Sequence, residues 1–302
     1  MLLELSGDLQ THDPTIIKEK GKYYRIQTGP GIPLFVSDNL KEWKAYGHIF
    51  NDSPSWVKEK VPLARKNDFW APDCLFRKGS YRIYYSVSSF GKNTSAIGMC
   101  KLSTLDLKSK AFTIEDCGPV LCSREKNDFN AIDAQVCSDG MDQDYLLFGS
   151  FWKGLQLVKL NEEGFVEEGA DFIHIASRNL IPNSIEGGFI YGRNDMYFLF
   201  ASHDFCCRGL ESTYKIVVGA SPSIEGPYYD GEGRPMLQGG GSLLRDGNSF
   251  SAFAGPGHNS IFEDEDGKTY IVYHAYDRQK GGRPVLQIEE IKWKNDWPYL
   301  EE

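Results

Sequence analysis

Five short apolar segments of the chain each begin with an ionisable side chain. These lead residues, spaced 60, 60, 53 and 72 positions apart, are Asp13, Asp73, Asp133, Glu186 and His258. A single Asp in such a place is more often a solvated turn residue or a hydrogen-bonding cap. Several carboxyl groups at equivalent places favour a function, because an unpaired buried charge costs several kcal/mol. Facing carboxyl groups are what glycoside hydrolysis requires: one protonates the leaving oxygen, and the other activates water or attacks carbon.

The segments that follow the lead residues share one layout. Each has an apolar run, a turn containing Gly, Asn or Asp, and an aromatic-rich run, which together predict a β-hairpin. The turns lie at 20–22, 78–80, 139–140, 193–195 and 266–268. Third apolar runs lie at 33–36, 96–99, 155–158, 214–218 and 285–288. No helical periodicity of more than about three turns competes with this pattern.

The repeat predicts the fold class. Five units of about 60 residues account for essentially the whole chain, and five radial antiparallel sheets form a five-bladed β-propeller. We therefore expect an all-β fold with a single propeller domain over residues 1–302. Two separate all-β domains are the alternative, but no linker or composition shift divides the chain. Since the first strand of each blade lines the central channel, the lead residues should converge around the axis.

Charge and composition exclude some classes of function. The formal net charge of −9, from 33 Lys and Arg against 42 Asp and Glu, makes a poor polyanion binder, so nucleic acid is not an expected partner. No apolar stretch approaches the ~20 residues that span a bilayer, so no membrane is expected either. The first residues lack the features of a secretion signal. The sequence leaves two options open, a cytoplasmic protein or a secreted one from which a signal peptide has been removed.

Seven cysteines are present, without a C-x-x-C pair of metal-binding type. Two of them, Cys206 and Cys207, are adjacent. A disulfide between neighbouring residues would strain the backbone, so both are expected to be free thiols.

Six short motifs in this order resemble those of glycoside hydrolase family 43. They lie at residues 11–14 (THDP), 69–73 (FWAPD), 86–91 (SVSSFG), 130–133 (NAID), 184–187 (SIEG) and 257–260 (GHNS). The runs at 95–98 and 212–219 also look similar to those of the arabinanases, the members that cleave α-1,5-L-arabinan. The motifs are weak individually and strong jointly, and they extend from Thr11 to the last blade.

The resemblance implies a five-bladed propeller that hydrolyses with inversion. By it, Asp13 is the general base and Glu186 the general acid, while Asp133 orients Glu186 and raises its pKa by like-charge proximity. An inverting pair should stand about 6.5–9.5 Å apart, to leave room for water. Asp73 matches no catalytic position of the family, and we interpret it as structural.

The resemblance also implies a metal ion and sugar contacts. The position of His258 matches a histidine that holds an ion, often calcium, in the central channel of arabinanases. Calcium prefers oxygen ligands, so the expectation that a single nitrogen ligand and water hold the ion rests mainly on the resemblance. Four residues match sugar-contacting positions, where aromatic rings stack on sugar C–H faces and polar groups bind hydroxyls: Trp70, Phe90, Asn130 and Ser150.

The sequence departs from the family pattern beside two catalytic positions. Ala134-Gln135 follows Asp133 where Pro-Asn is frequent, and Gly188-Phe189 stands where many relatives have Pro and an aromatic residue. The shape of the sugar subsites could therefore differ. The oligomeric state is not indicated by the sequence.

Endo action on arabinan is the main hypothesis. An exo-arabinanase, an α-L-arabinofuranosidase or a β-xylosidase is the alternative, if a wall formed by residues 206–210 or 238–253 closes one end of the cleft. A non-catalytic sugar-binding propeller is disfavoured by the three acids. A fructan-active propeller would be retaining and would carry an Asp nucleophile in a different motif.

Overall fold

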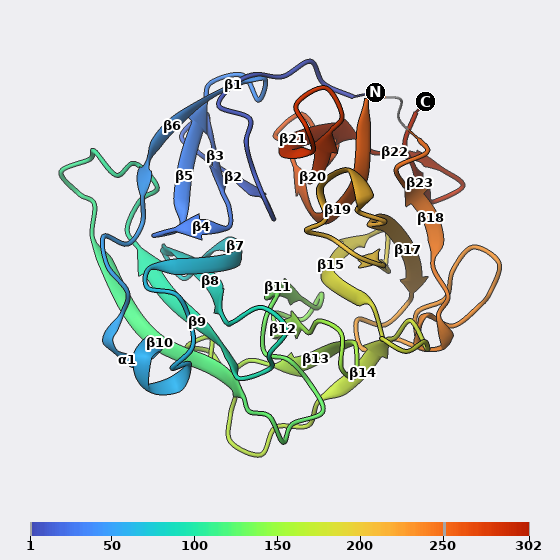
Figure 1. Ribbon diagram of the computed structural model, residues 1–302, viewed down its shortest axis with the longest axis horizontal. Coiled ribbons are helices and arrows are strands. Elements are labelled where there is room, and N and C mark those ends of the chain that lie inside the picture. The colour runs from blue at the N-terminus through green and yellow to red at the C-terminus, as the bar shows by residue number, and fades with distance from the viewer. Residues whose placement is uncertain (1, 250–251, 302) are drawn as a thin grey trace.

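The computed structural model describes residues 2–249 and 252–301. Over these residues the chain forms five antiparallel sheets around a central axis (Figure 1), which confirms the predicted all-β five-bladed propeller. In each blade the first strand lies nearest the axis and later strands lie progressively further out. No helix in the described part of the chain is both long and apolar enough to cross a membrane.

The strands of each blade follow the chain from the axis outward. Blade one contains β2 (Thr15–Glu19), β3 (Lys22–Ile26), β5 (Pro33–Ser37) and β6 (Glu42–His48), with β1 (Ser6–Gly7) at its outer edge. Blade two contains β7 (Asp68–Arg77), β8 (Ser80–Val87), β9 (Ser95–Leu102) and β10 (Ile114–Ser123), with β4 (Gly29–Pro30) paired to β7. Blade three contains β11 (Gln135–Ser138), β12 (Asp144–Phe148), β13 (Leu155–Lys159) and β14 (Ile173–Ala176).

The last two blades follow the same plan. Blade four contains β15 (Ile185–Arg193), β16 (Met196–His203), β17 (Lys215–Ser221) and β18 (Ser242–Arg245). Blade five contains β19 (Phe253–Glu263), β20 (Thr269–Asp277) and β21 (Arg283–Glu290), and a small sheet of β22 (Lys292–Lys294) and β23 (Trp297–Tyr299) follows. The short helices are α1 (Ser55–Lys60), η1 (Gly209–Glu211) and η2 (Met236–Gln238). All five predicted hairpins and all five third strands are therefore confirmed.

The N-terminal segment closes the ring. Leu2 and Gln10 form bridges to β21, and the Leu3 N–H donates to the Ile288 carbonyl at 2.9 Å. The segment therefore acts as an outer strand for blade five, while β1 pairs in parallel with β6 of blade one. First and last blades are joined by backbone hydrogen bonds, a closure that the sequence pattern did not predict.

The core lies between neighbouring blades. Among the described residues, buried side chains form five clusters, and each cluster combines two adjacent blades. The cluster between blades five and one, for example, packs Trp43 with Leu286 and Ile288. Since burying one large apolar side chain contributes about 1.5–3 kcal/mol, every blade depends on both of its neighbours.

Each blade has one residue in the left-handed conformation within its first strand or just before it. These residues are Asp13 (φ 50°), Ala71 (42°), Asp133 (59°), Gly187 (56°) and His258 (49°). In β7, β15 and β19 the strand register shifts across this position, as in a β-bulge. Bulges re-aim side chains and are common beside active sites.

These turns correct the predicted set of lead residues. Asp73 lies two residues beyond the left-handed position and Glu186 lies one residue before it. The two therefore do not occupy the same place in their blades as Asp13, Asp133 and His258, because a bulge changes which way successive side chains point.

Hydrogen bonds from the preceding blade hold most of these turns. The backbone N–H groups of Ala71, Asp133 and His258 donate to Thr28 Oγ1 (2.8 Å), Ser86 Oγ (2.9 Å) and Ser202 Oγ (2.7 Å), respectively. The Asp13 N–H donates to His274 Nδ1 at 3.3 Å. A side chain on or just after the second strand of one blade thus fixes the start of the next blade.

Candidate active site

Asp13 is held at the axis by three neighbours. Thr28 Oγ1 donates to its Oδ2 at 2.5 Å, and His12 Nδ1 donates to its Oδ1 at 3.0 Å. His258 Nδ1 lies 3.2 Å from the same Oδ1. The side chain of Asp13 is only 12% exposed. Such a carboxylate has a fixed orientation and retains limited access to solvent.

The histidines keep Asp13 ionised. Burial alone would raise the pKa of Asp13, but the charges of His12 and His258 and the hydrogen bond from His12 hold it well below its usual range. Burial likewise opposes the charge of His12, yet Asp13 raises the pKa of His12 to about 10. The pair is therefore carboxylate and imidazolium at neutral pH, and Asp13 can accept a proton.

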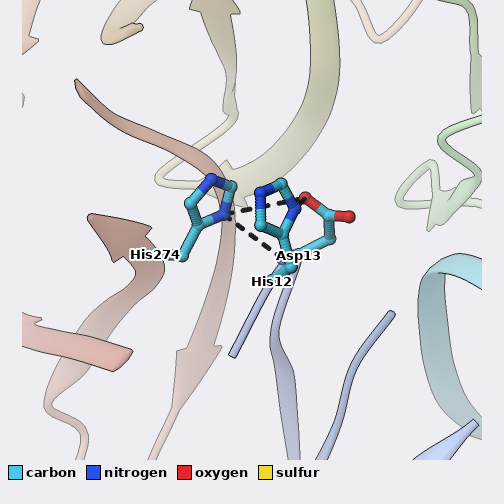
Figure 2. A group of neighbouring side chains, drawn as sticks. All are labelled: His12, Asp13 and His274. Atoms are coloured by element: carbon cyan, nitrogen blue, oxygen red, sulfur yellow. Dashed lines mark hydrogen bonds and ion pairs between the residues drawn. The ribbon is translucent and has the colours of Figure 1, made fainter. Parts of the chain in front are cut away.

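His12, Asp13 and His274 form the cluster of Figure 2. Their candidate ligand atoms lie within 4.8 Å of one another, and the rings of His12 and His274 stack at a centroid distance of 3.8 Å. Burial and the charge of His12 lower the pKa of His274 well below its usual value, which keeps it neutral. A metal ion bound here would have to displace the proton of His12 and break the hydrogen bond that the Asp13 N–H donates to His274. The cluster is therefore better suited to support the Asp13 carboxylate than to bind a metal ion.

Glu186 is positioned by two hydroxyl groups. Ser150 Oγ donates to Oε2 at 2.6 Å, and Tyr214 OH donates to Oε1 at 2.7 Å. Ser150 comes from blade three, just after β12, whereas Tyr214 precedes β17 of blade four. Both oxygens of the buried Glu186 side chain are thus held by rigid neighbours.

Asp133 lies within electrostatic reach of both other acids. Burial, then the charges of Glu186 and Asp13, raise its pKa well above the usual value, and the Gly187 N–H donates to Oδ2 at 3.2 Å. Two coupled carboxyl groups titrate as a pair. The carboxyl group of Asp133 therefore keeps its proton to a higher pH than an isolated carboxyl group does.

Asp73 connects three blades. Thr15 Oγ1 of blade one lies 3.4 Å from Oδ1, and the Val136 N–H of blade three donates to Oδ2 at 3.0 Å. These contacts agree with the structural role expected for this residue. Burial raises the pKa of Asp73 to about 6.

The four predicted sugar-contacting residues have different surroundings. Ser150 touches Glu186, whereas Asn130 is buried and accepts a hydrogen bond from Ser95 Oγ at 2.7 Å. Trp70 is partly buried beside the left-handed residue Ala71 of blade two. Phe90 is 82% exposed and could contact a ligand without a change in packing.

A small cavity lies along the axis. The residues that line it include Asp13, Asp73, Asp133, His258 and Asn259. The amide oxygen and nitrogen of the buried Asn259 have no hydrogen-bond partner in the protein. An unpartnered amide oxygen beside several carboxyl groups is the kind of donor that calcium prefers. The residues present therefore fit a channel cation.

Sequence reasoning missed the residues that support the acids. His12 and Tyr214 occur in the recognised motifs, but neither was predicted to have a role in the site. Thr28 and His274 were not singled out at all. In their own blades, Thr28 and His274 lie at or near the place that Ser86 and Ser202 occupy in the second strands of theirs. An alignment of the second strands could therefore have found them.

A propeller with an ionised carboxylate and two further buried carboxyl groups at its axis has the groups that glycoside hydrolysis requires. The comparison with known families agrees. The profile of the glycosyl hydrolases family 43 matches residues 7–298, and the chain belongs to this family.

Three relatives are particularly similar to the chain. It is 40% identical to the extracellular exo-α-(1→5)-L-arabinofuranosidase ArbA of Cellvibrio japonicus, over 97% of this chain and 87% of that protein. It is 39% identical to the extracellular endo-α-(1→5)-L-arabinanase 1 of Bacillus subtilis, over 95% and 86%. The solved structure of the Cellvibrio cellulosa α-L-arabinanase complexed with arabinohexaose is 39% identical, with a TM-score of 0.91, and the match covers 97% of this chain and 95% of that one.

Proposed function

We propose that the protein hydrolyses α-1,5-linked L-arabinan with inversion of the anomeric configuration. Asp13 is the general base, Glu186 the general acid, and Asp133 the residue that orients Glu186 and tunes its electrostatics. The observation that carries the proposal is the contrast between the surroundings of the three carboxyl groups. Histidines hold Asp13 as a carboxylate, burial and neighbouring carboxyl groups raise the pKa of Asp133, and two hydroxyl groups hold Glu186 in place.

The reaction follows from the roles assigned to these carboxyl groups. Asp13 accepts a proton from a water molecule, which attacks the anomeric carbon from the face opposite the leaving group. Glu186 gives its proton to the departing oxygen, and Ser150 and Tyr214 keep the carboxyl group aimed at that oxygen. The three supports around Asp13 prevent it from turning away from the water.

The names of the relatives support the substrate. One acts on α-(1→5)-arabinan as an endo enzyme, and another was solved with arabinohexaose. In this chain, Trp70 and Phe90 supply aromatic faces for sugar rings, and Asn130 and Ser150 supply polar groups. Gln135 and Gly188, where the sequence departs from the family pattern, both line the axial cavity beside the acids.

Endo cleavage is the first candidate for the mode of action, and exo cleavage the second. The exo name of one relative at 40% identity favours the second candidate. The segment at 206–210 lies at the active-site edge, where Cys207 approaches His12, and could act as a wall. The other candidate wall, 238–253, includes residues 250–251, which lie outside the described residues.

Debranched arabinan separates these possibilities. We expect oligomers of mixed length early in the digestion, and a first-formed anomer inverted relative to the substrate when followed by proton NMR. A single product from the first minutes would instead establish exo action. Retention of configuration would refute the assigned roles of Asp13 and Glu186. Absence of any digestion would indicate a sugar-binding protein without catalytic activity.

We also propose that the axial channel binds one calcium ion, with His258 as its nitrogen ligand. Asn259 Oδ1 and water would supply oxygen ligands. The ion supplies a positive charge beneath the acids when bound. The support is the donor set of the cavity together with the unpartnered amide of Asn259.

For the cellular compartment, we propose the secreted option. Two of the relatives are named as extracellular proteins, and a polymer such as arabinan is met outside the cell. Fractionation of the native host, with detection of the protein in the medium, would test this.

A further inference from the structure

Two adjacent thiols stand at the edge of the active site. Cys206 and Cys207 lie in the connection between β16 and β17, with their sulfur atoms 2.7 Å apart. Side chains of consecutive residues in an extended strand point to opposite sides. Here the left-handed conformation of Cys207 (φ 63°) allows both sulfurs to face each other. Both cysteines are free thiols, as expected from the sequence.

The pair is linked to the catalytic base through two groups. The Cys207 N–H donates to Tyr276 OH at 2.7 Å, and Tyr276 OH lies 3.1 Å from His12 Nε2. The Cys207 sulfur itself is 3.9 Å from the same nitrogen. Because His12 is also hydrogen-bonded to Asp13, a displacement of Cys207 would shift Asp13 through Tyr276 and His12.

We propose that Cys206 and Cys207 form a redox modification site, where a low-molecular-weight disulfide converts the two thiols into a reversible disulfide that slows hydrolysis. The effect on hydrolysis rests on the function proposed above. The chemistry of the thiols does not depend on it.

The two cysteines are suited to different steps. The hydrogen bond from Cys206 lowers the pKa of the Cys207 thiol to about 6, with His12 acting in the same direction and burial against it. The same hydrogen bond, with burial, raises the pKa of Cys206. Cys207 is also the more exposed of the two. Because the thiolate is the nucleophile, Cys207 attacks and Cys206 resolves.

The exchange balances with a disulfide such as oxidised glutathione. The Cys207 thiolate attacks one sulfur of the reagent, and one glutathione thiolate leaves. Cys206 then loses its proton, and its sulfur attacks Cys207 and displaces the second glutathione. One disulfide forms in the protein, and the reagent is reduced to two thiols.

Reversibility follows from the adjacency of the residues. Disulfide-linked residues usually have Cα atoms ~4.4–6.8 Å apart, whereas consecutive Cα atoms are held at about 3.8 Å. A strained, exposed disulfide is readily reduced. Formation must also shorten the S–S distance from 2.7 Å to about 2.05 Å, which moves Cys207 relative to Tyr276 and His12.

The test uses the full chain, first reduced and then treated with oxidised glutathione. The thiols that can be alkylated after denaturation should fall from seven to five, with a peptide map that assigns the loss to Cys206 and Cys207. The kcat/KM on an arabino-oligosaccharide should fall about tenfold, because small displacements of catalytic groups cost up to ~10²-fold. Dithiothreitol should restore both readouts.

Variants separate the possible outcomes. C206S/C207S should show no change on oxidation, whereas C117S, which removes a partly exposed thiol elsewhere, should respond like the native chain. A stable glutathione adduct on Cys207, seven thiols after oxidation, or a disulfide without any change in rate would overturn the proposal. A chain that loses two thiols but never hydrolyses arabinan would refute the proposed function instead, since the thiol count does not require activity.

Discussion

At the scale of single residues, the assignment of acid and base depends on neighbours rather than on the acids themselves. Asp13 and Asp133 are the same residue type, in the same left-handed conformation, at equivalent places in two blades. Histidines around the first lower its pKa, whereas burial and carboxyl groups around the second raise it. Environments that push the pKa values of like groups apart are what acid–base catalysis requires.

This arrangement predicts different behaviour for two alanine variants. Glu186→Ala and Asp13→Ala should each lower kcat on arabinan by about 10²–10⁴-fold. An arabino-oligosaccharide with a nitrophenyl leaving group needs no protonation, so it should restore much of the rate to Glu186→Ala and little to Asp13→Ala. The measurement is kcat on both substrates. Hydrolysis of arabinan at the native rate by either variant, or rescue of Asp13→Ala, would contradict the roles.

At the scale of strands and turns, much of the architecture could be predicted from the sequence. Turn residues and aromatic runs located the hairpins because their chemistry is local. The bulges could not be located this way, since a strand with one extra residue has the same composition, and Asp73 and Glu186 were therefore placed one or two residues out of phase. Nor did the pattern explain Gly188, where a Cβ atom would meet Leu155 at 2.9 Å.

Asp73 offers a test at this scale, since it connects the inner strands of three blades. Burial raises its pKa from 3.8 to about 6, so the fold favours the protonated form. The contribution of this protonation to the free energy of unfolding is fully present below the pKa of Asp73 in the unfolded chain. It is lost as the pH rises through the pKa of Asp73 in the folded protein, and it amounts to about 2–3 kcal/mol.

Asp73→Asn should remove this pH dependence. Its amide oxygen can still accept from Val136, and its NH₂ group can donate to Thr15. In thermal unfolding at pH 4, 5, 6 and 7, the Tm of the native chain should fall relative to that of the variant as the pH rises. Other titrating groups are common to both proteins and cancel in the difference. Parallel Tm curves would show that Asp73 is not buried as a protonated acid.

At the scale of the whole molecule, the ring joins local positions into one site. His12 and Tyr276 are 264 residues apart in the chain and share a hydrogen bond, because the N-terminal segment pairs with the last blade. Asp13, Asp73 and Asp133 come from three blades and converge on the axial cavity. Carboxyl oxygens that meet at one point make the channel a place where a cation can contribute to stability.

The last prediction is that calcium stabilises the entire propeller through this channel. A cation that binds only the folded ring contributes about 2.7 kcal/mol at a hundredfold excess over Kd, and each kcal/mol raises the Tm of a chain of this size by roughly 2–4 °C. Removal of divalent ions with EDTA should therefore lower the Tm by roughly 5–10 °C, and added calcium should restore it. His258→Ala should abolish the calcium response, whereas His174→Ala, on the outer strand β14, should keep it. An unchanged Tm after chelation, or a full response in His258→Ala, would exclude His258 as the ligand of a stabilising ion.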